Sequence, residues 1–307
     1  MIGNQVALIR RELWEHRSIY VTPLVIALIV SIMAITGQAV VSAFDQAVDI
    51  AIIGATNLGP AERAAAITVL MTGVSSLLIM AMWVLTIFYA LDALYAERKD
   101  RSILFWRSLP CTDAETVVSK LVTAAIVIPL VTFAVIVITH VVVLAVASVW
   151  LGFQGANAWH LIWRAAPLLN NWAGTLIVLL ALPLWLAPFI GWFLFVSAFT
   201  RRSPLLVAFL PIVILPMLEK SLIGSTVFFD AFFVRTGSMP LFRGLSTGDI
   251  FSYQGDEWSL NGEVPSGLLS LVDLSRFLGS GSLWIGLIVC GLFVTAAIYV
   301  RRYRDES

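Results

Sequence analysis

Long stretches without a charged residue alternate with short charged segments along this 307-residue chain. The uncharged stretches are 18–44, 64–91, 121–163, 165–200 and 277–300. Each is longer than the roughly 20 apolar residues that a helix needs to cross the hydrocarbon core of a bilayer. Lipid offers the backbone no hydrogen-bond partner, so such a stretch pairs its own N–H and C=O groups in a helix. The pattern therefore predicts an all-α membrane protein.

We expect six membrane-spanning helices in one transmembrane domain that covers residues 1–307. The stretch 121–163 is too long for one span and holds a helix and an outer loop, and the fifth span begins near Pro204. The expected spans are about 19–43, 66–92, 115–149, 172–199, 204–225 and 282–300. Residues 226–281 are then a long outer segment of mixed polarity. In the sixth span, Gly286 and Cys290 form a small-xxx-small pair, which favours close helix packing.

The composition supports this interpretation. Apolar residues make up 60% of the chain and charged residues 12%, whereas soluble domains have about 45–50% and about 25%. The 19 basic and 19 acidic side chains cancel, so no overall field attracts nucleic acid. Two cysteines do not make a disulfide framework, and three scattered histidines do not indicate a metal site. The composition argues against a soluble domain, a nucleic-acid partner and a bound metal.

The distribution of Lys and Arg predicts the orientation. With the N-terminus inside, thirteen of the nineteen basic residues lie in inner segments, as the positive-inside rule requires. They are Arg10, Arg11, Arg17, Arg98, Lys99, Arg101, Arg107, Lys120, Arg201, Arg202, Arg301, Arg302 and Arg304. Both termini are therefore expected in the cytoplasm. Residues 4–17 carry apolar side chains near helical spacing with charges between them, which predicts a helix in the inner membrane interface.

The cytoplasmic segment 97–120 is the most informative part of the chain outside the spans. Its middle, about 101–108, is predicted to form a short apolar helix that Pro110 ends. Thr112 and Glu115 then form a capping box, in which each side chain bonds the backbone N–H of the other residue. The third span therefore starts within the cytoplasm, after a separate short helix.

Four bulky apolar side chains, Ile103 to Trp106, lie on this solvent-facing loop and need a partner surface. One interpretation is that they lie against the membrane or against the chain's own helices. The other is that they dock in a groove of a second protein. The physical argument weighs the two about equally.

Six spans, an interfacial N-terminal helix and this loop together resemble the permease subunit of a type 2 ABC transporter, of the bacterial exporter type. The loop follows the family pattern at Glu97, Ser102, Ile103, Leu104, Ser108, Leu109, Pro110 and Lys120, but Arg101-Ser102 stands where the family often has Gly-Thr. The resemblance implies that the loop holds the coupling helix, between spans two and three. It implies contact with an ATPase through Glu97, Arg101, Ser102, Ile103, Leu104, Phe105, Trp106 and Pro110. It also implies that 222–245 re-enters the membrane from outside.

The resemblance implies partners as well, because the chain carries no motor of its own. None of the three lysines follows the glycines of a phosphate-binding loop, so this chain is expected not to be an enzyme and to bind no cofactor. ATP and Mg would sit on two copies of a separate P-loop ATPase. A second permease chain, identical or a paralogue, would complete the unit in a bacterial cytoplasmic (inner) membrane.

Three ionisable residues are candidates for a substrate path or gate, because charge inside a span is costly. The uncharged part of the fifth span, 203–218, measures about 24 Å at 1.5 Å per residue, shorter than the ~30 Å core. Glu219 and Lys220 then either line the outer end of the path or simply reach water where the helix ends. His140, in the third span, either contacts substrate or bonds a neighbouring helix.

Two other classes of function, an intramembrane enzyme and a secondary transporter, are alternatives to an ABC exporter. An intramembrane enzyme needs paired reactive groups at membrane depth, and His140 has no histidine four residues away on either side. A secondary transporter commonly shows two similar halves, and no repeat relates 1–150 to 151–307. An ATP-independent channel stays open as an alternative. The apolar loop favours the permease, because an ATPase-coupled permease specifically needs such a docking element.

Overall fold

The computed structural model describes residues 2–35, 59–100, 112–153, 157–237, 239–242, 251–254, 257–260 and 267–303. Within these ranges, six helices are long and apolar enough to cross a membrane, which confirms the predicted number of spans. They are Ser18–Ile35, Pro60–Lys99, Asp113–Phe153, Leu168–Trp185, Pro204–Leu222 and Gly281–Tyr303. The chain is treated below as a multi-pass membrane protein.

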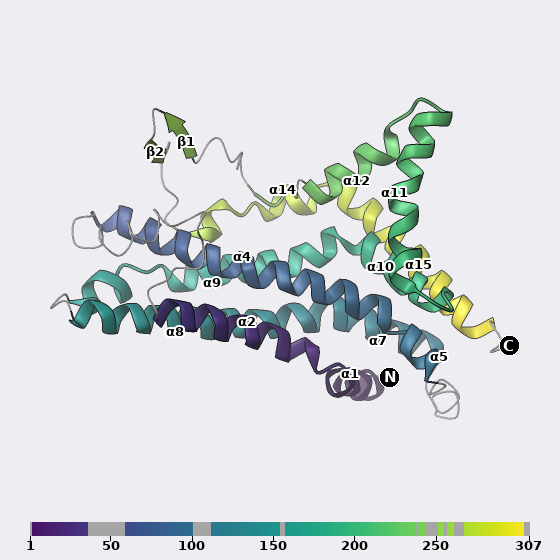
Figure 1. Cartoon of the computed structure of the whole chain (residues 1–307), viewed down its shortest axis with the longest axis horizontal. Coiled ribbons are helices and arrows are strands. Elements are labelled where there is room, and N and C mark those ends of the chain that lie inside the picture. Colours follow the sequence, from purple (N-terminus) through teal and green to yellow (C-terminus); the bar gives the residue numbers. More distant parts are fainter. Residues whose placement is uncertain are drawn as a thin grey trace.

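Most of the spans form one elongated bundle (Figure 1). The helices along its long axis are α2 (Ser18–Ile35), α4 (Pro60–Asp92), α8 (Ile128–Phe153) and α9 (Leu168–Trp185). One end holds both termini and is called the terminal end below; the other is the distal end. At the terminal end lie α1 (Ile2–Glu15), α5 (Tyr95–Lys99), α7 (Asp113–Val122) and the last turns of α10 (Ala187–Phe199) and α15 (Gly281–Tyr303). A π-helical turn, η2 (Thr123–Val127), joins α7 to α8.

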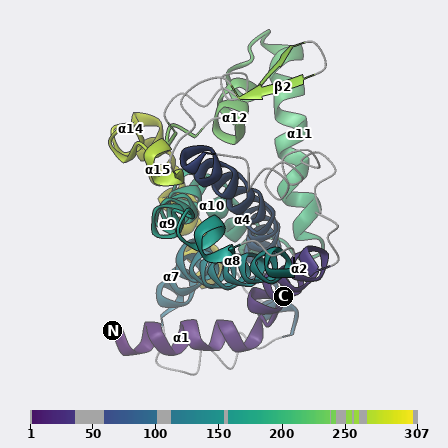
Figure 2. The same cartoon turned by 90° about the vertical axis from the view of Figure 1, so that its left-hand side faces the viewer.

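The first helix, α1, runs across the bundle rather than along it. Figure 2 shows α1 from the side while the long helices run toward the viewer. Leu8 and Glu12, one turn apart, are buried against the bundle, whereas Val6 and Trp14 are exposed. The predicted amphipathic helix is therefore present, with a carboxylate on its buried face.

The predicted fourth span, 172–199, is two helices rather than one. α9 ends at Trp185 and α10 begins at Ala187, with Leu186 between them at φ −90° and ψ 12°. Pro188 has no N–H to donate to the carbonyl four residues earlier, and its ring clashes with that carbonyl. The helix therefore breaks just before this proline.

Close packing of α10 on α15 depends on Gly191 of α10. A Cβ atom on Gly191 would lie 3.0 Å from both Cα and O of Cys290, so the two backbones approach as only a glycine allows. Gly286, the other small residue expected to aid packing, instead makes room for the Arg235 side chain, whose Nη2 would lie 1.7 Å from an added Cβ. The small pair in the sixth span thus serves two different contacts.

The fifth span leaves the bundle at a steep angle (Figure 1). In α11 (Pro204–Leu222), 6% of the apolar stretch is buried inside the structure, against 22% to 44% in the other five spans. The chain then reverses at Gly224, whose φ of +68° suits a residue without a side chain. α12 (Val227–Gly237) returns toward the bundle, so α11 and α12 form a helical hairpin. Most of the surface of α11 is apolar and uncovered.

The segment between α12 and α15 is not purely helical. It holds an antiparallel hairpin of β1 (Phe251–Gln254) and β2 (Glu257–Leu260), in which Phe251 pairs with Leu260, a departure from the expected all-α chain. Its other elements are a 3-10 turn, η4 (Leu268–Leu271), and α14 (Leu274–Leu278). Asn170 and Asn171 of α9 fix η4, because their Oδ1 atoms accept the N–H groups of Leu269 at 3.0 Å and Leu268 at 2.8 Å. A π-helical turn, η3 (Trp159–Trp163), precedes α9.

We predict that Gly191→Ala destabilises the bundle and that Gly291→Ala does not. Both variants gain the same helix propensity of about 1 kcal/mol, but only the first forces a methyl group against a backbone, because Gly291 has nothing within 4 Å of an added Cβ. Overpacking of this kind costs about 1–3 kcal/mol. Thermal unfolding in detergent would measure the difference, and equal melting temperatures would contradict the packing described here.

Candidate functional site

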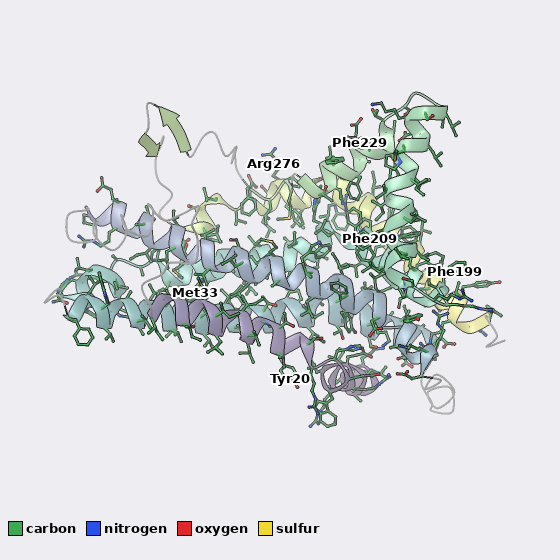
Figure 3. All side chains as sticks on the ribbon, viewed as in Figure 1. Tyr20, Met33, Phe199, Phe209, Phe229 and Arg276 are labelled. Atoms are coloured by element: carbon green, nitrogen blue, oxygen red, sulfur yellow. The ribbon has the colours of Figure 1, made fainter. Side chains whose placement is uncertain are left out.

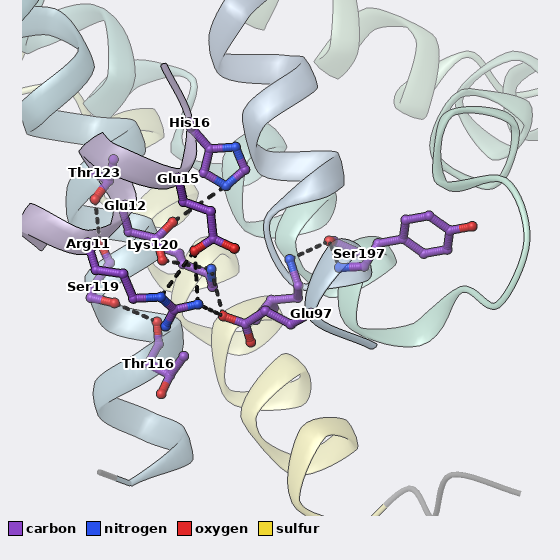
Figure 4. Close-up of polar contacts among 12 residues, drawn as sticks. Arg11, Glu12, Glu15, His16, Glu97, Thr116, Ser119, Lys120, Thr123 and Ser197 are labelled. Atoms are coloured by element: carbon purple, nitrogen blue, oxygen red, sulfur yellow. Dashed lines mark hydrogen bonds and ion pairs between the residues drawn. The ribbon is translucent and has the colours of Figure 1, made fainter. Parts of the chain in front are cut away.

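A cluster of buried charged side chains joins the helices of the terminal end (Figure 4). Its members are Arg11 and Glu12 of α1, Glu97 of α5, Asp113 and Lys120 of α7, and Arg301 of α15, and we call them the charge cluster. Four elements that are distant in sequence therefore meet at one polar site. Glu12, Glu97 and Lys120 have side chains no more than 1% exposed, so their charges are compensated by one another rather than by water.

The Glu97 carboxylate is the centre of the charge cluster. Its Oε1 lies 2.9 Å from Arg11 Nη2 and 3.0 Å from Lys120 Nζ, and Arg301 Nη1 donates to its Oε2. One carboxylate thus accepts from three cations that come from three different helices. Removal of Glu97 would leave three neighbouring positive charges without their shared partner.

Lys120 joins Glu97 to a second buried acid, Glu12. Lys120 Nζ lies 2.9 Å from Glu12 Oε1, and the Tyr89 hydroxyl donates to Glu12 Oε2 at 2.8 Å. His16, one turn after Glu12, places Nε2 3.8 Å from the same carboxylate. The acid on the buried face of α1 is therefore satisfied by groups from α4 and α7.

The charge cluster is close to electrically neutral. Its three acids, Glu12, Glu97 and Asp113, balance its three cations, Arg11, Lys120 and Arg301 (−3 and +3), and the exposed Glu15 adds a carboxylate 3.0 Å from Arg11 Nη2 at the surface. Asp113 Oδ1 accepts from Arg301 Nε at 2.9 Å, at the more exposed edge of the cluster. Burial of unpaired ions costs several kcal/mol each, so this balance is a condition for the helices to meet at all.

The charge cluster lies at both ends of the loop 101–111, which the sequence predicts to be cytoplasmic and to dock on a partner. Of the coupling residues proposed from the sequence, Glu97 lies in the cluster, just before the loop. Asp113 and Lys120 follow it. The others, Arg101, Ser102, Ile103, Leu104, Phe105, Trp106 and Pro110, lie outside the described residues. The chain on each side of 101–111 is therefore tied to α1 and α15.

The predicted capping box at the far end of this loop is confirmed. The Glu115 N–H donates to Thr112 Oγ1 at 3.1 Å, and the Thr112 N–H donates to Glu115 Oε2 at 2.9 Å. The cap starts α7 at a fixed residue, which sets the position of Asp113 and Lys120 relative to the other helices.

A second set of polar contacts ties α5 to the end of α10. Ser197 Oγ accepts the N–H groups of Leu94 and Tyr95 at 3.0 Å each, where α4 gives way to α5. Arg98 Nη2 donates to the carbonyls of Ser197 and, at 2.7 Å, Thr200, which lie at the C-terminal end of α10. A cation is favourable at the negative end of a helix dipole. The turn that carries Glu97 is thus held from two sides.

His140 belongs to the packing of three helices. Its Nε2 lies 2.9 Å from the Met71 carbonyl and 3.3 Å from Ser75 Oγ, and the Trp172 indole N–H donates to its Nδ1 at 3.3 Å. Donation by Trp172 makes Nδ1 the acceptor, so Nε2 carries the proton. His140 is only 1% exposed. It bonds neighbouring helices, which is one of the two alternatives that the sequence left open.

Glu219 and Lys220 lie in the last turn of α11. Glu219 Oε2 accepts the Phe228 N–H at 3.0 Å, and Oε1 accepts from Ser225 Oγ at 2.9 Å. This carboxylate therefore caps the first turn of α12, where an anion is favourable, and fixes the hairpin. Lys220 is exposed. The helix extends past both residues to Leu222 rather than ending at them.

Arg235 fastens the other end of α12 to the bundle. Arg235 Nε donates to the Trp185 carbonyl at 2.8 Å, its guanidinium carbon lies 4.3 Å from the Trp185 ring centroid, and the Trp185 indole N–H donates to the Arg235 carbonyl at 2.7 Å. Nη1 donates to Ser282, at the start of α15. The break at Leu186 frees the Trp185 carbonyl for this contact, and Arg235 does not pair with Asp230.

An apolar cavity of about 540 Å³ lies between α4, α9, α10, α11 and α12. Its walls include the rings of Trp83, Phe189, Phe193 and Phe209. Figure 3 shows Phe209 on α11. The centroid of the Phe209 ring lies 5.8 Å from that of the Phe193 ring. Among the described residues that line the cavity, none is His140, Glu219 or Lys220. Glu219 and Lys220 therefore do not line the cavity, and His140 lies behind its wall, 3.3 Å from the lining residue Ser75.

No family model, curated protein or solved structure matches this chain. The site is therefore interpreted from its own geometry. That geometry consists of a neutral, buried charge cluster at the base of a loop and an apolar cavity farther along the same helices. α4 takes part in both, because Tyr89 contacts the cluster and Trp83 lines the cavity.

The sequence missed most members of the charge cluster. Glu12 offered a signal, since it occupies the same face of α1 as Leu8. Lys120 and Arg301 offered another, because each directly borders a long uncharged span. Nothing in the sequence paired them, since the contacts of Glu97 and Glu12 join residues 86, 108 and 204 positions apart.

We predict that Arg301→Met is strongly destabilising and that Arg302→Met is nearly neutral. Arg301 bonds Glu97 and Asp113, and loss of one partner from a buried ion pair costs about 3–5 kcal/mol. The neighbouring Arg302 is exposed, and such surface changes stay within about 0.5 kcal/mol. Unfolding of the two variants in the same detergent is the measurement. Equal stabilities would contradict the role assigned to the cluster.

Proposed function

We propose that this chain is the permease subunit of an ATP-binding cassette exporter, working with a separate P-loop ATPase. The observation that carries the proposal is the position of the charge cluster, which ties both ends of the 101–111 loop to α1 and α15. A loop that receives force from a motor needs a base that moves as one body. The cluster supplies such a base, because its helices share buried ion pairs.

In this proposal the terminal end faces the cytoplasm and α1 lies along the inner membrane surface. The crosswise course of α1, with Val6 and Trp14 exposed beside a buried Glu12, supports that position. The coupling residues would be Glu97, Arg101, Ser102, Ile103, Leu104, Phe105, Trp106 and Pro110. ATP and Mg would be bound by the ATPase and not by this chain, which would be non-catalytic.

The uncovered surface of α11 supports a second permease chain in the same unit. α11 has far less of its surface buried than the other spans, and its apolar side chains are exposed on several sides, including Leu206, Leu210 and Val213. A partner related by two-fold symmetry would cover the same face on both chains. The segment 222–245, which holds α12, would then re-enter the membrane from outside, and the membrane would be a bacterial cytoplasmic one.

The test is purification of the chain from its native membrane in mild detergent, with mass spectrometry of the partners and an assay of ATP hydrolysis. The proposal expects a stoichiometric P-loop ATPase with measurable turnover. A correctly folded chain that elutes with no nucleotide-binding partner would refute the permease reading and favour a channel or an intramembrane enzyme.

We predict that the double variant Phe105→Ala, Trp106→Ala uncouples the ATPase without unfolding the membrane domain. Truncation of an aromatic interface anchor costs about 2 kcal/mol or more, so affinity for the ATPase should fall at least about 30-fold. The matched control is Phe153→Ala, Trp159→Ala, which removes two exposed aromatic rings at the distal end. Full transport and ATPase binding by the loop variant would show that the loop is not the coupling element.

A further inference from the structure

The apolar cavity has a polar end and an apolar end. Toward the distal end its wall contains four hydroxyl residues, Thr72, Ser75 and Ser76 of α4 and Thr175 of α9, of which Ser75 has its Oγ 3.3 Å from His140 Nε2. Toward the terminal end, α4 contributes Ile87. Because α4 is one continuous helix, Thr72 and Ile87 are separated by about 22 Å along its axis at 1.5 Å per residue. The cavity is therefore lined over most of a ~30 Å hydrocarbon core.

The apolar end is built mainly from aromatic rings. Phe193 of α10 faces Phe209 of α11 with ring centroids 5.8 Å apart, and Phe189 faces Phe232 of α12 at 5.5 Å. These side chains offer no hydrogen bond, so they suit hydrocarbon and reject a polar group. A volume of about 540 Å³ drawn out over this length fits an elongated ligand better than a compact one.

The polar end carries hydroxyls and no ion. Among the described residues that line the cavity, every side chain is uncharged. The nearby Arg235 directs Nε and Nη1 to Trp185 and Ser282 and packs Nη2 against Gly286, and none of these three residues lines the cavity. A hydroxyl both donates and accepts, and Ser76 Oγ, which donates to the Gly73 carbonyl at 2.8 Å, keeps its lone pairs for a ligand. The end therefore suits a neutral headgroup, because an ion would be buried without a counter-ion.

We propose that this cavity binds one neutral amphiphile, with its hydrocarbon chain between α10 and α11 and its uncharged polar head beside Thr72 and Ser76. This names the ligand class for the proposed permease and rests on that function only for movement of the ligand, since binding needs this chain alone. With the distal end outside, the head points to the outer face, as in a lipid of the outer leaflet.

Head-group preference is tested with three competitors of identical alkyl chain. A photoreactive monoalkylglycerol labels the purified chain in nanodiscs, and monoacylglycerol, the matching fatty acid at alkaline pH and the matching alkyltrimethylammonium compete with it. The neutral competitor should act at least about tenfold more tightly than either ion, because burial of an unpaired charge is unfavourable. Equal or stronger competition by an ion would overturn the proposal.

Orientation is tested by the position of the photoreactive group. A diazirine at the chain terminus should label the peptide around Phe193 or Phe209, and one at the glycerol should label residues 72–76. The reverse pattern, or labelling spread over the exposed face of α11, would overturn the proposed pose.

A cavity-filling variant supplies the matched control. Ser76→Phe adds a ring inside the cavity and should reduce labelling at least about fivefold, whereas Leu210→Phe adds a ring on an exposed face of α11 and should leave it unchanged. Thr72→Val is a milder second variant, in case Ser76→Phe does not fold, because it removes a hydroxyl at nearly constant volume. It should reduce the preference for the neutral head. Unchanged labelling by both cavity variants would overturn the site.

The two sources of such an amphiphile, bilayer lipid and exported cargo, are separated by repeating the labelling with the ATPase present. Cargo is released on ATP turnover, whereas a resident lipid stays bound, and either result retains the ligand class. Failure to find an ATPase refutes the proposed function but leaves the binding result standing. Failure of the binding tests refutes the ligand class but leaves the coupling proposal standing.

Discussion

The packing of the helices at the terminal end depends on the ion pairs that the Glu97 carboxylate makes with three cations. Arg11, Lys120 and Arg301 reach it from α1, α7 and α15. Each ion loses hydration when the helices pack, and the loss is offset only when all partners are in place. The arrangement is therefore cooperative, since displacement of one helix leaves the charges of the others unpaired. Hydrophobic contact alone would allow the same helices to slide or rotate past one another.

The same helices carry this constraint toward the cavity. α4 contacts the charge cluster through Tyr89 and lines the cavity from Ile87 to Thr72. α10 receives Arg98 at its C-terminal end and presents Phe189 and Phe193 to the cavity. The two sites are thus parts of continuous rigid elements. In the proposed permease, a shift of the cluster would be transmitted to two cavity walls through these helices.

The break between α9 and α10 serves the opposite side of the cavity. At the break the Phe189 N–H donates to the Leu186 carbonyl instead of the Trp185 carbonyl, which accepts from Arg235 of α12. Glu219 holds the other end of α12 by accepting the Phe228 N–H. The α11–α12 hairpin is therefore fixed internally by Glu219, and it is joined to the bundle by Arg235 and by the Trp192 indole N–H, which donates to the Ala208 carbonyl at 3.0 Å. Glu219, one of the candidate path residues, thus fixes a helix that lines the cavity.

Local features of the structure followed from the sequence. The six spans were predictable because lipid forces long apolar stretches into helices, and the Thr112–Glu115 cap was predictable because both partners lie within one turn. The break before Pro188 also had a local cause, although the sequence interpretation ran one helix through it. The coupling role of residues 101–111 stays a prediction, since it concerns a partner and falls on residues outside those described.

The sequence by itself determined that this chain is a six-span helical membrane protein with a charged loop between its second and third spans, because hydropathy and capping act over neighbouring residues. Only the tertiary structure decided which charges meet. The three partners of Glu97 come from three separate helices, and Glu219 and Arg235 act on different elements from their own. Such pairings depend on how whole helices cross, and the spacing of residues along one chain does not record that.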